Sequence, residues 1–77
     1  MDAGTGDAVF LYGGDAAALA ATHDGGSNFA VIEETDAFLS MGLLINEIGA
    51  YSGTVPISSG PSVLMVTADG NWTLQVQ

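Results

Sequence analysis

The apolar and polar residues alternate most regularly at the C-terminal end of the chain. Trp72, Leu74 and Val76 alternate with threonine and glutamine, which is the period of a β-strand with one buried face. A second apolar run, residues 62–67, is separated from this strand by residues 68–71, Ala-Asp-Gly-Asn. Asp-Gly between two apolar runs favours a hairpin, because glycine adopts a positive φ without steric cost. The pattern therefore predicts a C-terminal β-hairpin.

The length of the hairpin loop decides which residues share a face with Trp72. A two-residue loop would place Val63 and Met65 on that face, whereas a loop of Asp69-Gly70-Asn71 would place residues 64, 66 and 68 there. The second arrangement gives one face made of six apolar side chains. We therefore expect the three-residue loop, with Val63 and Met65 facing outward.

Residues 15–22 fit either a helix or a strand. Alanine favours a helix and Asp15 would cap one, but Leu19 is the only large apolar side chain that such a helix could bury. In a strand, Leu19, Ala21 and His23 share one face, and this is the reading that we favour.

Other segments also read as short strands. They are residues 8–12, 29–34, 37–48 and 50–57, with a possible bulge near Gly42 and an edge position implied by Pro56. Six or seven short strands between Gly- and Asp-containing turns predict an all-β fold, a small antiparallel β-sandwich or jelly-roll-like domain. Residues 1–77 are expected to form this single domain, with residues 1–6 as a loose N-terminal arm or the start of a first short strand.

Charge changes the picture more than any other compositional feature. The chain has nine acidic residues and neither lysine nor arginine. Their absence excludes nucleic-acid binding through phosphate neutralisation, which needs lysine or arginine, and it argues against anionic membranes as partners. Unpaired carboxylates repel one another unless salt screens them, which predicts an acidic, halophilic protein. Only 12% of the residues are charged, so we expect neighbouring chains to cover part of the apolar surface.

No segment has the length of a membrane span. The uninterrupted apolar runs, such as Leu43-Leu44-Ile45 and residues 8–12, are far short of the ~20 residues that a spanning helix needs. The first seven residues contain neither a basic nor an apolar segment, so we expect no export signal in this chain.

Candidate catalytic and metal-binding residues are few. His23 is the single histidine and there is no cysteine, so we expect neither a zinc site nor a catalytic triad. We expect His23 instead to form a hydrogen bond with a carbonyl group of a turn. Calcium is the more reasonable ion, with Asp24 and Asn28 at one turn and Glu33 and Asp36 near the next. Neither spacing matches a known calcium loop. We therefore favour the interpretation that these residues form turns or are solvated on the surface.

Three segments have a recognisable combination of residues. They are Thr22-His23-Asp24-Gly25 followed by Asn28-Phe29-Ala30-Val31, then Leu44-Ile45-Asn46-Glu47-Ile48-Gly49-Ala50-Tyr51-Ser52-Gly53, and finally Ala68-Asp69-Gly70-Asn71-Trp72-Thr73-Leu74. Over residues 17–77 the chain resembles a small β-sandwich module of prokaryotic surface proteins and lipoproteins, and more loosely a pre-peptidase C-terminal jelly-roll domain. Met65 departs from that pattern, because such modules usually have a polar residue there. The resemblance implies an accessory role in binding, spacing or assembly, and it supplies no catalytic residues.

Together these observations predict a structural protein rather than an enzyme. We expect self-association, or packing on a larger protein scaffold, through exposed apolar residues such as Val55, Ile57, Val63 and Met65. A virion decoration, turret or minor capsid protein of a halophilic virus fits this description, as does an accessory of an extracellular surface layer. The alternative is a calcium- or carbohydrate-binding accessory domain. Trp72, Tyr51 and Tyr12 would be candidates for a sugar platform, but Trp72 is expected in the core.

Overall fold

A computed structural model describes residues 2–35 and 41–77. Every regular element in these two ranges is a β-strand, and there are eight of them. In chain order they are β1 (Asp2–Thr5), β2 (Ala8–Tyr12), β3 (Ala17–His23), β4 (Asn28–Thr35), β5 (Met41–Ile48), β6 (Tyr51–Ile57), β7 (Ser62–Ala68) and β8 (Asn71–Val76). The all-β class expected from the sequence is confirmed.

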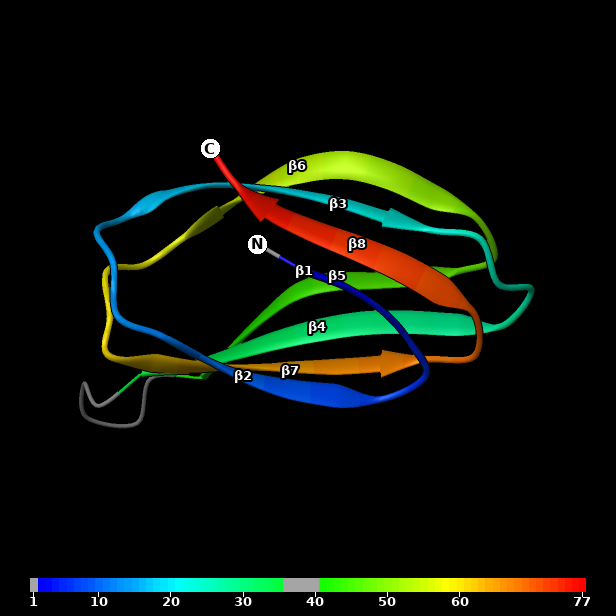
Figure 1. Ribbon diagram of the computed structural model, residues 1–77, viewed down its shortest axis with the longest axis horizontal. Helices are drawn as coiled ribbons and strands as arrows, with labels where there is room; N and C mark the ends of the chain where they lie inside the picture. Colours follow the sequence, from blue (N-terminus) through cyan, green and yellow to red (C-terminus); the bar gives the residue numbers. More distant parts are fainter. Residues whose placement is uncertain (1, 36–40) are drawn as a thin grey trace.

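The strands form two four-stranded antiparallel sheets, with the orders β1-β8-β3-β6 and β2-β7-β4-β5. Figure 1 shows them as two layers, with β6, β3 and β8 above and β4, β7 and β2 below. We call them the β3 sheet and the β4 sheet after one central strand of each. Most of the chain alternates between the layers, so strands that follow one another in sequence mostly lie in different sheets. The arrangement fits a small β-sandwich.

The core lies between the two sheets and contains the residues that alternate inward along each strand. Its largest fully buried side chains come from four strands: Leu19, Phe29, Val31, Leu64 and Leu74. Burying each of them stabilises the fold by ~1.5–3 kcal/mol. Phe10 lies edge-on to Trp72, with ring centroids 5.5 Å apart, and so joins the two sheets.

The predicted C-terminal hairpin is wrong. β7 pairs with β2 and β4, whereas β8 pairs with β1 and β3, so Asp69-Gly70 turns the chain from one sheet into the other. The inward faces are nevertheless as expected, since Leu64, Val66, Trp72 and Leu74 are all buried. The strand count also differs, since the described residues form eight strands where six or seven were expected.

The partners of Asn71 explain why β8 leaves β7. The Asn71 main-chain N–H donates to Asp24 Oδ1 at 2.8 Å, and the Asp24 main-chain N–H donates to the Asn71 carbonyl at 3.0 Å. These bonds hold the start of β8 beside the end of β3. Gly70 does not have the positive φ that the hairpin requires, since Gly6 and Gly49 are the glycines with positive φ among the described residues.

Residues 17–23 are a strand, as favoured from the sequence, and Leu19, Ala21 and His23 share its buried face. The irregularity expected near Gly42 falls at Leu44, because Val31 pairs with Ile45 while Ile32 pairs with Leu43. Pro56 lies on β6, which is an edge strand as predicted. The expected N-terminal arm contains β1, which pairs with β8.

Candidate functional site

The outward-facing side of the β4 sheet is apolar across all four of its strands. Pairing places Leu11 beside Val63, Val9 beside Met65, and Ile32 between Met65 and Leu43, and cross-strand partners share a face. We call this surface the apolar outer face, formed by Val9, Leu11, Ile32, Leu43, Val63 and Met65. Leu11 is 84% exposed, Val9 68% and Leu43 58%. Ile48, 78% exposed, lies farther along β5.

The outward-facing side of the β3 sheet has the opposite character. Its exposed positions include Thr22, Ser52, Thr54, Thr73 and Gln75, which lie next to one another in the register. The Thr22 and Thr73 hydroxyls are hydrogen-bonded to each other across the strands. Exposed apolar side chains are therefore not spread evenly over the molecule. They are concentrated on one of its two outer faces. The two sides of the molecule therefore differ in polarity, and the apolar outer face is the candidate contact surface.

The four interface residues expected from the sequence divide between the surface and the core. Val63 and Met65 are half-buried and lie on the apolar outer face, as expected. Val55 is half-buried and packs against the core. Ile57 is 4% exposed and belongs to the core, so its expected exposure is wrong. Alternation along β6 turns it inward with Val55.

Val9 and Leu11 are exposed apolar residues, and so candidates for an interface, that sequence reasoning missed. Residues 8–12, Ala-Val-Phe-Leu-Tyr, are apolar at both alternating sets of positions. In a two-layered sandwich only one face of a strand meets the core, so such a strand must leave one apolar set outside. Phe10 is the inward residue, and Val9 and Leu11 are therefore exposed.

The candidate calcium ligands are not brought together by the fold. Asp24 precedes β4 and Glu33 lies near its end, and at ~3.3 Å per residue the strand keeps them far apart. The Asp24 carboxylate accepts from the Asn71 N–H and, at 3.1 Å, from Asn71 Nδ2. Asn28 is the first residue of β4 and is exposed. Asp36 lies outside the described residues. Among those residues no three acidic or histidine side chains are grouped to hold a metal ion.

Glu33 is buried although the chain has no lysine or arginine to pair with it. Its side chain faces inward on β4 and is 6% exposed. One carboxylate oxygen, Oε2, accepts the Ser58 main-chain N–H at 2.7 Å. The carboxylate therefore ties the end of β4 to the connection after β6, which is a structural role.

His23 is buried at the end of β3 and is held on several sides. Its ring stacks on Phe29, with centroids 4.6 Å apart and planes 8° apart. The Gly49 carbonyl oxygen can only accept, so His23 Nδ1 donates to it at 2.9 Å, which is the turn contact expected from the sequence. The other nitrogen, Nε2, lies 3.3 Å from Asp69 Oδ1. The ring thus links the end of β3 to the turn at Gly49 and packs on β4 through Phe29.

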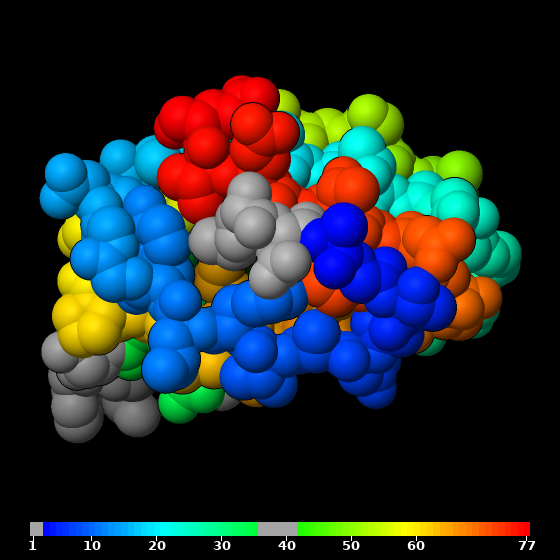
Figure 2. Space-filling view, viewed as in Figure 1, coloured from blue at the N-terminus to red at the C-terminus, as the bar shows by residue number. Residues whose placement is uncertain are grey.

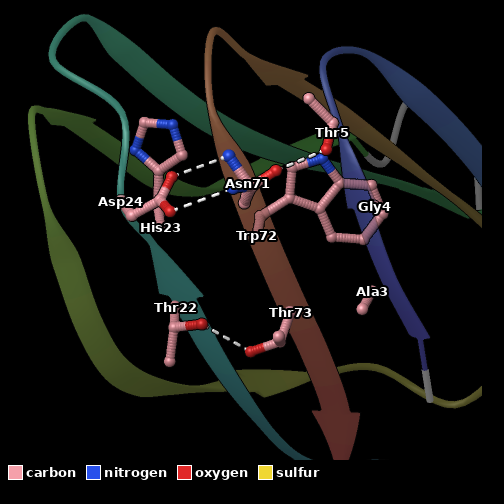
Figure 3. A pocket seen from close by; sticks show the side chains of 9 residues that line it. All are labelled: Ala3, Gly4, Thr5, Thr22, His23, Asp24, Asn71, Trp72 and Thr73. Atoms are coloured by element: carbon pink, nitrogen blue, oxygen red, sulfur yellow. Dashed lines mark hydrogen bonds between the residues drawn. The ribbon is translucent and has the colours of Figure 1, made fainter.

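A hollow of about 540 Å³, lined by both polar and apolar groups, lies at the same end, where β1, β8 and β3 meet. Figure 3 shows its lining residues: Ala3, Gly4, Thr5, Thr22, His23, Asp24, Asn71, Trp72 and Thr73. Several of its polar side chains are hydrogen-bonded to one another. Asn71 Nδ2 donates to the Asp24 carboxylate, and Asn71 Oδ1 accepts from the Thr5 hydroxyl. Trp72 is 3% exposed, and its indole N–H donates to the Gly6 carbonyl at 2.7 Å. The aromatic ring is therefore part of the core, as expected.

No family model, curated protein or solved structure matches the chain. The resemblance to modules of prokaryotic surface proteins therefore stays a prediction. In the part of the chain that the structure describes, no helix has the length and apolar character needed to cross a membrane.

Proposed function

We propose that this chain is a non-enzymatic structural module that associates with copies of itself, or with a larger protein scaffold, in concentrated salt. The observation that supports it most strongly is the apolar outer face, which exposes large aliphatic side chains on a domain of 77 residues. A decoration, turret or minor capsid protein on a halophilic virus particle would use such a face, as would an accessory of an extracellular surface layer.

Charge links the proposed association to salt. Each copy has a formal net charge of −9, so two copies repel each other in dilute buffer. Concentrated salt screens this repulsion, and strongly hydrated salts also strengthen apolar association. The apolar outer face has few acids among its described residues, with Glu34 beside Val63 in the register. Association through this face is therefore expected to increase with salt.

The double variant Leu11→Thr with Leu43→Thr tests the role of the apolar outer face. Both side chains are exposed, so the fold should tolerate the changes, while the face loses two of its largest apolar groups. We expect weaker association in multimolar salt, measured as a lower weight-average mass at equal protein concentration. The matched control, Leu11→Val with Leu43→Val, keeps the face apolar and should associate like the unmodified chain. Equal association of both variants would remove the support for this proposal.

A ligand-binding accessory role is the second candidate, and the hollow where β1, β8 and β3 meet is the observation that favours it. Its threonine hydroxyls, the Asn71 amide and the Asp24 carboxylate are the kinds of group that contact a sugar or a calcium ion. A rise in the thermal midpoint with calcium at fixed high ionic strength, absent in Asp24→Ala, would support a calcium site. No response to calcium or to a panel of oligosaccharides would count against this role.

A further inference from the structure

We propose that β2 is the site at which a second copy of this chain adds, by antiparallel pairing of β2 with β2 of the other copy. The inference rests on the proposed function, because it names the contact through which the module associates. Its starting point is the topology: β2 is at the end of the β4 sheet and pairs with β7 on one side. A free strand edge presents main-chain N–H and C=O groups that another strand can bond.

The other three sheet edges have features that discourage strand addition. β1 has four residues and begins with Asp2. β5 has an irregular register at Leu44 and exposes Asn46 and Glu47. β6 contains Pro56, which has no N–H to donate. Short length, bulges, charges and prolines are the devices by which natural sheets protect their edges.

β2 has none of these features. All five of its residues pair with β7 in an unbroken register, from Ala8 with Val66 to Tyr12 with Ser62. Its sequence, Ala-Val-Phe-Leu-Tyr, contains no charge, proline or glycine. Val9 and Leu11 are among the most exposed large apolar side chains described. Figure 2 shows the β2 segment, in blue, near the lower margin of the molecule. Among the edge strands that the structure describes, β2 is thus the one without such protection.

Charge and shape indicate why a second copy is a suitable occupant. Antiparallel pairing centred on Phe10 places Val9 opposite Leu11 of the other copy, and Ala8 opposite Tyr12, so apolar side chains meet on both faces. In the same register Asp7 lies opposite Gly13 rather than opposite another acid. The Asp7 carboxylate also points toward β7, where Oδ1 accepts the Ala68 N–H at 3.1 Å. A strongly acidic chain can therefore pair with itself here without opposing two carboxylates.

The pairing would join two β4 sheets into one sheet of eight strands. Because Val9 and Leu11 lie on the apolar outer face, the two copies of that face would become continuous across the junction. The contact is two-fold symmetric, so each copy uses the same surface and the pairing closes at a dimer. The enlarged apolar surface would then be available to a scaffold.

Single-cysteine variants test the contact and its register, since the chain contains no cysteine of its own. Val9→Cys and Leu11→Cys chains are mixed in equal amounts in multimolar salt and treated with a short thiol-specific cross-linker. We expect the mixed dimer, identified by mass spectrometry, to exceed each dimer of identical chains by clearly more than the roughly twofold excess that random pairing of equal amounts gives, because positions 9 and 11 of opposite copies are ~4.5–5.5 Å apart between Cβ atoms. The matched control is a mixture of Leu43→Cys and Ile48→Cys on β5, the opposite edge of the same sheet.

The outcomes separate this inference from the proposed function. If the unmodified chain associates but the β2 pair cross-links no better than the β5 pair, the β2 contact is wrong while association stands. A predominance of dimers of identical chains would overturn the register centred on Phe10. If the unmodified chain is a monomer at every salt concentration, self-association fails together with this inference.

A charge-insertion pair gives a second, independent readout. In the proposed register, Val9→Glu with Leu11→Glu places like charges directly opposite each other, which destabilises strand pairing. Leu43→Glu with Ile48→Glu makes the same charge change on the same sheet at the other edge. We expect at least a tenfold weaker dimer for the β2 variant than for the β5 variant by sedimentation velocity. Equal weakening of both would contradict pairing through β2.

Discussion

At the scale of single residues, the corner between the two sheets depends on the close approach of two glycines. A Cβ placed on Gly70 would lie 2.6 Å from the Gly25 Cα and 2.7 Å from the Gly25 N, and both of these atoms are main chain. We expect Gly70→Ala to lower the free energy of unfolding by about 1–3 kcal/mol, because one of the two turns must move. Urea denaturation followed by circular dichroism measures this.

Gly26→Ala is the matched control, because Gly26 is the neighbour of Gly25 and its added Cβ would meet no atom within 4 Å. Its free energy of unfolding should stay unchanged or rise by up to about 1 kcal/mol, since alanine restricts the unfolded chain. If Gly70→Ala were as stable as Gly26→Ala, the packed corner described above would be wrong.

Glu33 and Glu34 are consecutive residues with opposite surroundings. Glu33 is buried and accepts the Ser58 N–H, whereas Glu34 is exposed on the outer side of β4. We expect Glu33→Ala to destabilise the fold by about 1–3 kcal/mol, because it leaves that N–H without its acceptor. Glu34→Ala should change stability by no more than about 0.5 kcal/mol. Glu33→Gln keeps an acceptor oxygen, so its loss of stability should lie between those of the two alanine variants. Similar denaturation midpoints for Glu33→Ala and Glu34→Ala would contradict the role given to Glu33.

At the scale of strands, the sequence indicates which face of each strand is buried better than it indicates which strands pair. Alternation correctly turns Trp72 and Leu74 inward, because burial depends on side chains that recur every second residue. The Asp69-Gly70 turn was misread as a hairpin, because the residue that fixes β8 is Asp24, 47 positions from its partner Asn71. Contacts over that separation leave no local pattern in the chain.

The candidate site was predictable to a similar extent. Alternation predicts that Val63 and Met65 face outward, because Leu64 and Val66, on the other face of β7, fill the core. Val9 and Leu11 were not found, because Ala8–Tyr12 is apolar throughout and periodicity does not select one side. Ile57 was misplaced because Pro56 marks an edge strand but does not say which of its faces is inward.

Amide hydrogen exchange provides a test at this scale. β3 is paired on both sides by β6 and β8, and β4 by β5 and β7, whereas β1 and β6 are edge strands. We expect the amides of Leu19, Ala21, Phe29 and Val31 to exchange most slowly, because their opening requires most of the fold to open. Exchange of β1 and β6 as slow as that of β3 would contradict the strand order.

At the scale of the whole molecule, the charge distribution predicts a salt requirement for folding itself. The chain has nine acidic side chains and no lysine or arginine. Folding therefore brings negative charges closer together, and no lysine or arginine is present to offset their repulsion. We expect the thermal midpoint to rise by on the order of 10 °C from dilute buffer to multimolar salt, as screening removes several kcal/mol of repulsion. Differential scanning calorimetry over a salt series measures it. A midpoint independent of salt would contradict a high-salt environment.

Association in salt is the central claim, and sedimentation velocity of the unmodified chain tests it most directly. The measurement is made over a range of protein concentrations in dilute buffer and in multimolar salt, with density and viscosity corrections. We expect a monomer in dilute buffer and a discrete oligomer with an even number of copies in high salt, because the apolar outer face and β2 are exposed in the single chain. A monomer under all conditions would contradict self-association and leave a different protein as the partner of this face.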